Sequence, residues 1–201
     1  MLRVPYDKTY AYMQDSTGEY INEQVVLFGP YQQETWQIAY NPENLDSVET
    51  VAVFQYNRIG VEIDTLPDFY LTSAFGGRMR EQVRHYTNVA DAFEAMRNGE
   101  VSAVMGMRSE IDHELAKSEN TAFKAAGNGF PGIGKQVWDV GMAIKHTHRQ
   151  LGYALEAIVD RLVKSGEMNE LMASQNLRYS VPGYYRAFLE EEAIARAEGD
   201  L

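Results

Sequence analysis

Apolar residues in the first part of the chain occur in short runs that are separated by turn-forming residues. The run at 24–29 ends at Gly29-Pro30, a strong turn signal, and residues 35–40 alternate loosely. Residues 51–54 (VAVF) form a continuous apolar run of the kind that a buried parallel strand shows. Residues 69–75 have room for another short strand. The pattern predicts a sheet with the 51–54 strand near its centre.

Residues 87–105 carry the clearest secondary-structure signal. Thr87-Asn88 offers an N-cap. The apolar residues that follow have helical i, i+3, i+4, i+7 spacing: Val89, Ala92, Phe93 and Met96. Asn98-Gly99 ends this helix, and residues 101–105 (VSAVM) read as a second buried strand. A helix, a tight glycine turn and a buried strand form half of a βαβ unit, so we expect an α/β fold.

Further helices and strands are expected in the second half of the chain. In order, they are a polar helix at 109–118, a Gly/Pro-rich loop at 127–134, a strand at 137–144, a long amphipathic helix from His148 to a Ser165-Gly166 stop, a short helix at 168–174 and a charged terminal helix at 184–197. The long helix has an apolar stripe that consists of Leu151, Ala154, Leu155, Ile158, Val159 and Leu162.

These elements predict a largely parallel sheet, with strands 51–54 and 101–105 at its centre and helices on both faces. The helical patterns also predict which side chains are buried. They are Val89, Phe93, Met96, Leu155, Ile158 and Leu162.

Composition excludes several classes of function. The 201 residues carry a formal net charge of -11, which argues against a nucleic-acid-binding surface and against adsorption to anionic lipid. The absence of cysteine excludes disulfides, a cysteine nucleophile and thiolate metal sites. No apolar run is long enough to span a bilayer, and MLRVPYDKTYAYMQD lacks the apolar core of a signal peptide.

Motifs for enzyme chemistry are missing or incomplete. His146 and His148 are two residues apart, but no third ligand lies close in sequence, so metal binding is not expected. The glycines of GNGFPGIG (127–134) lack the Lys-Ser/Thr of a phosphate-binding loop. Neither a Gly-x-Ser-x-Gly elbow nor a His-Glu-x-x-His motif occurs. The sequence therefore predicts a protein that is not an enzyme and has no cofactor.

Three segments together resemble the type II periplasmic solute-binding proteins, in particular the amino-acid-binding branch. NLDSVETVAVFQYNR (44–58) resembles the start of the family's second lobe. VADAFEAMRNGEVSAVMG (89–106) resembles its helix, glycine turn and strand. VWDVGMAIKHTHRQLGYALEAIVDRLVKSGEMNELMASQNL (137–177) is similar to the closing signature of a strand, a long helix, a turn and a short helix.

The resemblance implies a substrate-binding component of an ABC-type uptake system in the periplasm. It would bind a small polar solute between two lobes, with a membrane permease or another protein subunit as its partner. By position, 1–44 would be a remnant of lobe one and hinge, 45–145 lobe two, 146–180 helices returning to lobe one and 181–201 an extra helical tail. The family's opening strand and helices have no counterpart before Leu2, which implies a shortened chain whose signal peptide would also be lost.

The family's ligand-binding positions are poorly matched. The arginine that grips the ligand's carboxylate falls on Asp7, and a Gly-Thr-Thr after the second-lobe strand falls on Tyr56, Asn57 and Arg58. The aspartate that binds the ammonium group falls on Met107. A free α-amino acid held in the usual way is therefore not expected. The polar residues implied around the cleft are Asp7, Tyr56, Asn57, Arg58 and Arg108. They suit a larger or partly cationic solute, or they are an ordinary surface loop.

Two alternatives remain open at this stage. A sensor domain of the same fold would regulate a linked output, and an accessory protein would have lost its ligand and use the fold for contact with other proteins.

The apolar stripe of the long helix concerns the stability of the chain and its assembly. Without the opening part of lobe one, Leu151, Leu155, Ile158 and Leu162 would lack packing surface, so we expect a chain that is unstable alone, binds free ligand poorly and is found in an assembly.

Overall fold

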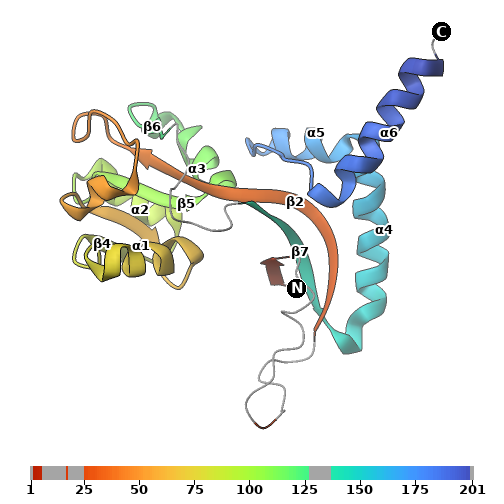
Figure 1. The fold of residues 1–201 in the computed structure, drawn as a ribbon, viewed down its shortest axis with the longest axis horizontal. Coiled ribbons are helices and arrows are strands. Elements are labelled where there is room, and N and C mark those ends of the chain that lie inside the picture. Colours follow the sequence, from red (N-terminus) through yellow and green to blue (C-terminus); the bar gives the residue numbers. More distant parts are fainter. Residues whose placement is uncertain (1, 6–16, 18–24, 127–136, 200–201) are drawn as a thin grey trace. The chain divides into compact units, whose positions relative to one another are not determined.

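The computed structural model describes residues 2–5, 17, 25–126 and 137–199, and it has a sheet flanked by helices, as an α/β fold requires (Figure 1). The strands are β1 (Leu2–Pro5), β2 (Val25–Tyr40), β3 (Ile59–Glu62), β4 (Val83–Tyr86), β5 (Ala103–Met107), β6 (Lys124–Ala125) and β7 (Val137–Lys145). The α-helices are α1 (Leu66–Gly77), α2 (Val89–Arg97), α3 (Arg108–Leu115), α4 (Arg149–Ser165), α5 (Glu167–Ser174) and α6 (Gly183–Gly199).

The chain divides into two compact units. Unit 1 consists of Met1–Glu34, Val137–Ser174 and Tyr179–Leu201. Unit 2 consists of Thr35–Gln136 and Gln175–Arg178. Strand β2 begins in unit 1 and ends in unit 2, because the division falls between Glu34 and Thr35.

Unit 2 is built on a mixed sheet. Strand β3 is parallel to both β4 and β5, whereas the end of β2, Trp36 to Tyr40, is antiparallel to β5. Helix α2 packs on β3 and β5 and buries its whole apolar face, because Val89 is 5% exposed and Phe93 and Met96 are 0% exposed. The Asn88 side chain caps this helix by accepting a hydrogen bond of 2.8 Å from Asp91 N–H. The helix and its buried side chains were predicted correctly.

Two predicted strands of unit 2 are helical instead. Val51–Gln55 is a 3-10 helix that begins after Thr50, whose hydroxyl accepts a hydrogen bond from Ala52 N–H. Its apolar run is buried through Val51 and Phe54, which are three residues apart and so lie on one side of a helical turn. The strand at the centre of the three parallel strands is β3, not residues 51–54. Residues 69–73 are helical in α1, where Pro67 at the helix start suits a helical first turn, and the backbone leaves helical geometry at Ala74, Phe75 and Gly76.

Unit 1 has β7 between β1 and β2, and β1 is antiparallel to β7. Strand β7 matches its prediction. Strand β2 runs through Gly29-Pro30, where the sequence predicted a turn. In the order of the sheet, β7 is the only described neighbour of this part of β2, and proline's missing N–H is tolerated on such an edge.

Helix α4 buries a narrower face than its sequence predicts. Its buried residues are Gly152, Val159 and Val163, which pack with Phe28, Met142 and Ile144. Leu155 and Leu162 are only half-buried, and Ile158 is 47% exposed and Leu151 54% exposed. The prediction that Leu155, Ile158 and Leu162 are buried was therefore wrong. The described part of unit 1 covers one flank of the apolar stripe and leaves the other in solvent.

Candidate functional site

The three parallel strands of unit 2 end at one edge of the sheet. Their registers pair Ile59 with both Val83 and Ala103, so Glu62, Tyr86 and Met107 all lie at the carboxyl edge. The helices that follow these strands begin at this edge, with Leu66, Val89 and Arg108 as their first residues. Ligands of open α/β sheets bind beyond the carboxyl ends of the strands, so this edge is where a site is expected.

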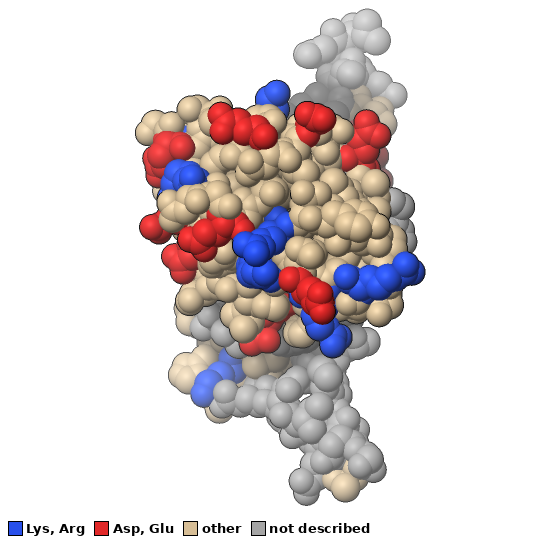
Figure 2. All heavy atoms as spheres, turned by 90° about the vertical axis from the view of Figure 1, so that its left-hand side faces the viewer, with Lys and Arg blue, Asp and Glu red and all other residues tan. Residues whose placement is uncertain are grey.

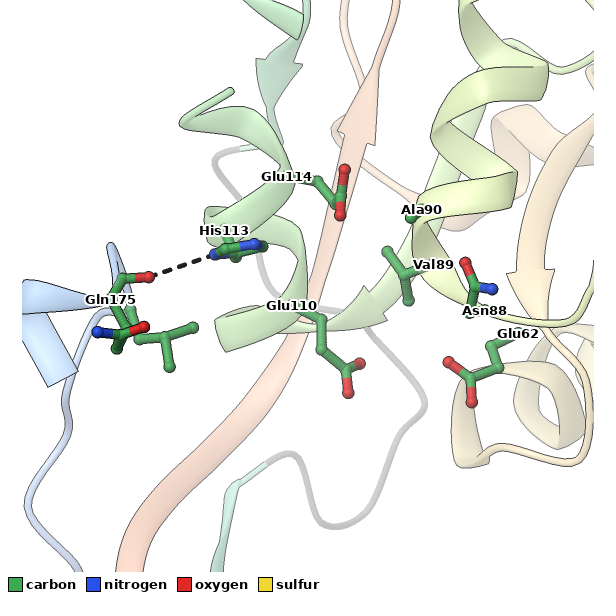
Figure 3. Close-up of a pocket in the computed structure, with 9 residues that line it drawn as sticks. Glu62, Asn88, Val89, Ala90, Glu110, His113, Glu114 and Gln175 are labelled. Carbon is green, nitrogen blue, oxygen red and sulfur yellow. Dashed lines mark hydrogen bonds between the residues drawn. The ribbon is translucent and has the colours of Figure 1, made fainter. Parts of the chain in front are cut away.

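A pocket of about 490 Å³ lies at this edge of unit 2 (Figure 3). Its walls come from the end of β3, the first turn of α2, helix α3 and the segment after α5. The residues that line it are Glu62, Asn88, Val89, Ala90, Glu110, His113, Glu114, Gln175 and Leu177. All of them belong to unit 2.

Carboxylates give the pocket its chemical character. The side chains of Glu62 and Glu110 extend into the pocket from opposite walls (Figure 3). Burial raises the pKa of the Glu62 carboxyl above its ordinary value, because the charged form is partly desolvated. Glu114 Oε1 forms an ion pair of 2.7 Å with Lys117 Nζ. A positively charged group of a ligand would therefore stabilise the ionised form of this partly desolvated carboxyl group.

The remaining polar groups of the pocket hold its walls in place. His113 Nδ1 lies 3.3 Å from the carbonyl oxygen of Gln175, which joins α3 to the segment after α5 (Figure 3). Asn88 caps α2, and its amide also donates a hydrogen bond of 3.0 Å to Asp91. Among the described residues, none forms a hydrogen bond or an ion pair with the Glu62 carboxylate, so this carboxylate is available to a ligand.

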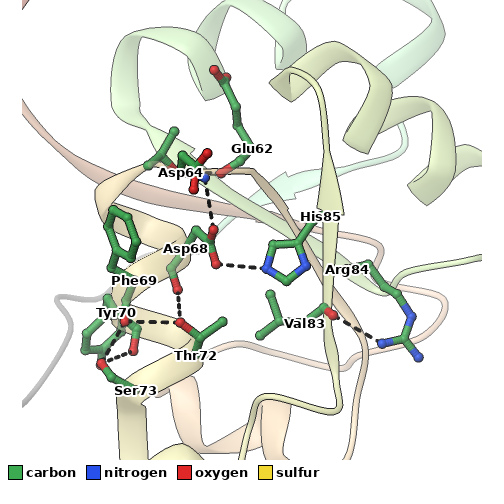
Figure 4. Close-up of polar contacts among 11 residues, drawn as sticks. Glu62, Asp64, Asp68, Phe69, Tyr70, Thr72, Ser73, Val83, Arg84 and His85 are labelled. Carbon is green, nitrogen blue, oxygen red and sulfur yellow. Dashed lines mark hydrogen bonds and ion pairs between the residues drawn. The ribbon is translucent and has the colours of Figure 1, made fainter.

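The turn between β3 and α1 is fixed by a buried carboxylate. Asp68, 6% exposed, accepts a hydrogen bond of 3.0 Å from Asp64 N–H through Oδ2, and its Oδ1 lies 2.9 Å from Nε2 of His85 on β4 (Figure 4). Thr65 Oγ1 donates a hydrogen bond of 2.7 Å to Glu62 O. One side chain thus ties the residues after β3 to the neighbouring strand, which positions Glu62 at the carboxyl edge.

The residues predicted for the site are not brought together. Asp7 lies outside the described residues. Tyr56, Asn57 and Arg58 precede β3, so they lie at its amino end, whereas Arg108 follows β5 at the carboxyl edge. Asn57 is occupied locally, since its amide donates a hydrogen bond of 2.9 Å to Val53 O. Arg108 instead acts on Asp112. Burial raises the pKa of the Asp112 carboxyl above its ordinary value, and the positive charges of Arg108 and Arg178 offset part of this rise.

The misplaced strand accounts for this separation. The resemblance puts polar ligand-binding residues directly after a strand that the sequence analysis placed at residues 51–54, whereas the strand of this region is Ile59–Glu62. The residues that follow it are Ile63, Asp64 and Thr65. The sequence analysis missed Glu62, Glu110 and His113. The available signal was an acid at the end of a strand and two polar residues three positions apart on the next polar helix.

Other candidate features give no site. Among the described residues, no group of three or more His, Asp or Glu side chains is placed to hold a metal ion, and the whole glycine-rich stretch 127–134 lies outside the described residues. On the face that Figure 2 shows, basic side chains lie singly or in small groups among acidic ones. None of the helices in the described part of the chain is long and apolar enough to cross a membrane.

Comparison with solved structures identifies this fold, whereas no protein-family model and no curated protein matches the chain. The chain is similar to an amino acid ABC transporter substrate-binding protein from Streptococcus pneumoniae bound to L-arginine, with a TM-score of 0.64, 14% identity and coverage of 76% of this chain and 61% of that one. A mutant of ArgBP from T. maritima has a TM-score of 0.61, 18% identity and coverage of 75% and 61%.

A solute receptor for L-cysteine from Neisseria gonorrhoeae is also similar, with a TM-score of 0.59, 14% identity and coverage of 76% of this chain and 58% of that one. The chain thus spans about three fifths of the length of these proteins. It has the fold of the substrate-binding proteins of amino-acid ABC transporters over about three quarters of its own length, as the resemblance predicted.

Proposed function

We propose that the chain is the substrate-binding component of an ABC-type solute uptake system and works in the periplasm with a membrane permease. The observation that carries the proposal is the position of the pocket. In a fold shared with substrate-binding proteins, the pocket lies beyond the carboxyl ends of parallel strands, where small ligands of α/β proteins bind. Unit 2 would correspond to lobe two, and unit 1 to the part of lobe one that this chain contributes.

The chemistry of the pocket favours a solute with a positively charged group. Met107 holds the position of the family's ammonium-binding aspartate and is an apolar residue. Glu62 and Glu110, from β3 and α3, supply negative charge at the same edge of the sheet. A cationic group of the ligand would pair with Glu62 and remove the cost of its partial burial, whereas a ligand of net negative charge would be repelled.

A titration followed by NMR tests this proposal. The purified chain is titrated with L-arginine, putrescine and L-glutamate, and the amide signals of Glu62, Asn88 and Glu110 are followed. We expect saturable shifts with the two cationic compounds and none with L-glutamate. Because a partly exposed ion pair contributes up to about 1 kcal/mol, Glu62→Gln should weaken binding by about threefold to fivefold.

Glu119→Gln is the matched control, since it removes the same charge from an exposed residue of unit 2 outside the pocket. It should leave the affinity unchanged. Equal binding of L-glutamate, or an affinity that responds equally to both variants, would contradict a cation-selective site at Glu62.

A further inference from the structure

A second pocket, of about 360 Å³, lies in unit 1 where α4, α6 and β2 meet. Its lining residues are Gly29, Tyr153, Glu156, Ala157, Asp160, Tyr184 and Tyr185. None of them belongs to unit 2, so this pocket is separate from the one at the carboxyl edge of the parallel strands.

The wall that α6 contributes is held firmly in place. Asp139 on β7 caps α6 by accepting hydrogen bonds from Gly183 N–H at 3.0 Å and Tyr184 N–H at 3.4 Å. Gln33 on β2 donates to Asp139 at 3.1 Å and accepts a hydrogen bond from Arg186. Tyr185 is 3% exposed and joins the core of unit 1. The start of α6 is therefore anchored to two strands.

Three tyrosines, Tyr153, Tyr184 and Tyr185, are among the residues that line the pocket. Tyr184 contacts Tyr185 edge-to-face with ring centroids 5.0 Å apart, and Tyr153 contacts Phe28 in the same manner at 5.3 Å. Tyr184 is 67% exposed and Tyr153 is 53% exposed, so each has ring surface that its neighbour leaves uncovered. Exposed faces of aromatic rings attract cations through their quadrupoles.

Two carboxylates on α4 complete the lining, and among the described residues only Asp160 has a partner. Asp160 forms an ion pair of 2.9 Å with Lys164, one turn further along the helix. The Lys164 ammonium also lies 4.7 Å from the centroid of the Phe188 ring on α6. Glu156 is half-buried, and no described residue forms a hydrogen bond or an ion pair with its carboxylate.

Lys164 shows how this surface holds a cation. Its ammonium group lies between a carboxylate of α4 and an aromatic ring of α6. One turn earlier on α4, Glu156 stands in the place of Asp160, and Tyr153 and Tyr184 stand in the place of Phe188, but no described cationic residue lines the pocket there. The pocket thus combines a carboxylate with aromatic rings, as the surface around Lys164 does, but no described cationic residue is among its lining residues.

We propose that this pocket of unit 1 is a second binding site, which takes an alkylammonium or guanidinium group. Glu156 would pair with the charge, and the rings of Tyr153 and Tyr184 would cover its flanks. The pocket is large enough for a small organic cation or for the end of one basic side chain. This pocket is distinct from the solute site of unit 2, because the two pockets share no lining residue.

The experiment compares a cation with its neutral counterpart. The chain is titrated with choline and with 3,3-dimethylbutan-1-ol, which has nearly the same shape without the charge, and the ring signals of Tyr153 and Tyr184 are followed by NMR. Choline should shift them saturably, and the neutral alcohol should not. We expect Glu156→Gln to weaken choline binding by about threefold to fivefold and Tyr184→Leu by about twofold to fivefold.

Two controls make the result decisive. Glu119→Gln removes the same charge from unit 2 and should leave choline binding unchanged, and circular dichroism verifies that each variant is folded. The peptides acetyl-Gly-Arg-Gly-amide and acetyl-Gly-Gln-Gly-amide distinguish the source of the cation. Binding of the arginine peptide alone, without choline, assigns the site to a partner's basic side chain. Equal shifts by the neutral alcohol, or full choline affinity in Glu156→Gln, would overturn the proposal.

Discussion

Helices α2 and α4 have equally clear amphipathic patterns, yet they differ in how much of their apolar face is buried. In unit 2, Val89, Phe93 and Met96 of α2 are all buried against β3 and β5. In unit 1, α4 buries Val159 and Val163 but leaves Ile158 and Leu151 about half exposed. A periodic sequence thus shows which side of a helix is apolar, while the available partner surface decides how much of that side is covered.

The largest expected effect is on the free energy of unfolding of unit 2. Phe93→Ala removes a fully buried ring that contacts Phe123, so it should cost about 3–5 kcal/mol. Ile158→Ala also shortens an apolar side chain of a helix, but that side chain is 47% exposed, and the loss should stay under about 1 kcal/mol. Amide hydrogen exchange, read separately for β5 and β7, measures both losses. Similar losses for the two variants would mean that the stripe of α4 is covered in solution.

A smaller effect is expected where α4 does pack closely. A Cβ at Gly152 would lie 2.0 Å from Cε2 of Phe28, whose ring is buried. Gly152→Ala should therefore destabilise unit 1 by about 1–3 kcal/mol, although alanine is the better helix former. Gly183→Ala is the matched control, because its Cβ would meet Asp139 at an ordinary 3.5 Å. Urea unfolding of both variants tests this, and equal stability would show that β2 and α4 are less closely packed.

The smallest effect concerns the pH dependence of stability at the pocket of unit 2. Burial raises the pKa of Glu62 above 4.5, so the folded state holds this proton more tightly than the unfolded state does. Its contribution to stability is present below pH 4.5 and is lost as the pH rises through the raised pKa. Glu62→Gln should thus be slightly more stable than the wild type at pH 7, within about 0.5 kcal/mol, and this advantage should disappear at low pH. Thermal melts from pH 3.5 to 7 measure it; an advantage that grows toward low pH would contradict the assignment.

The sequence predicted elements well where local signals agreed. For α2, the N-cap at Asn88, the helical spacing and the stop at Gly99 all favour the same structure. It failed at residues 51–54, because a short apolar run does not distinguish a strand from a buried helical turn by periodicity alone. It failed at Ile158 for another reason. Exposure depends on which surface lies opposite, and that surface comes from distant parts of the chain.

The candidate site was less predictable than the fold. Its lining comes from β3, α2, α3 and the segment after α5, which are far apart in sequence and are brought together by the parallel pairing of β3 with β5. The position of the first strand decided which residues were chosen. Because that strand was placed before Tyr56 rather than at Ile59, the three residues chosen after it, Tyr56, Asn57 and Arg58, lie at the amino end of β3.

The segments that build the two units also set an order of assembly during synthesis. Nearly all of unit 2 is one continuous stretch, Thr35–Gln136, so a ribosome releases its strands and helices together. Unit 1 joins residues before Glu34 to residues after Val137, and its core includes Tyr185. Its first strands must therefore wait for the last helix to emerge, and the apolar surface around Phe28 stays open during that interval. Unit 1 is consequently the part of the nascent chain whose apolar surface waits longest for its packing partners.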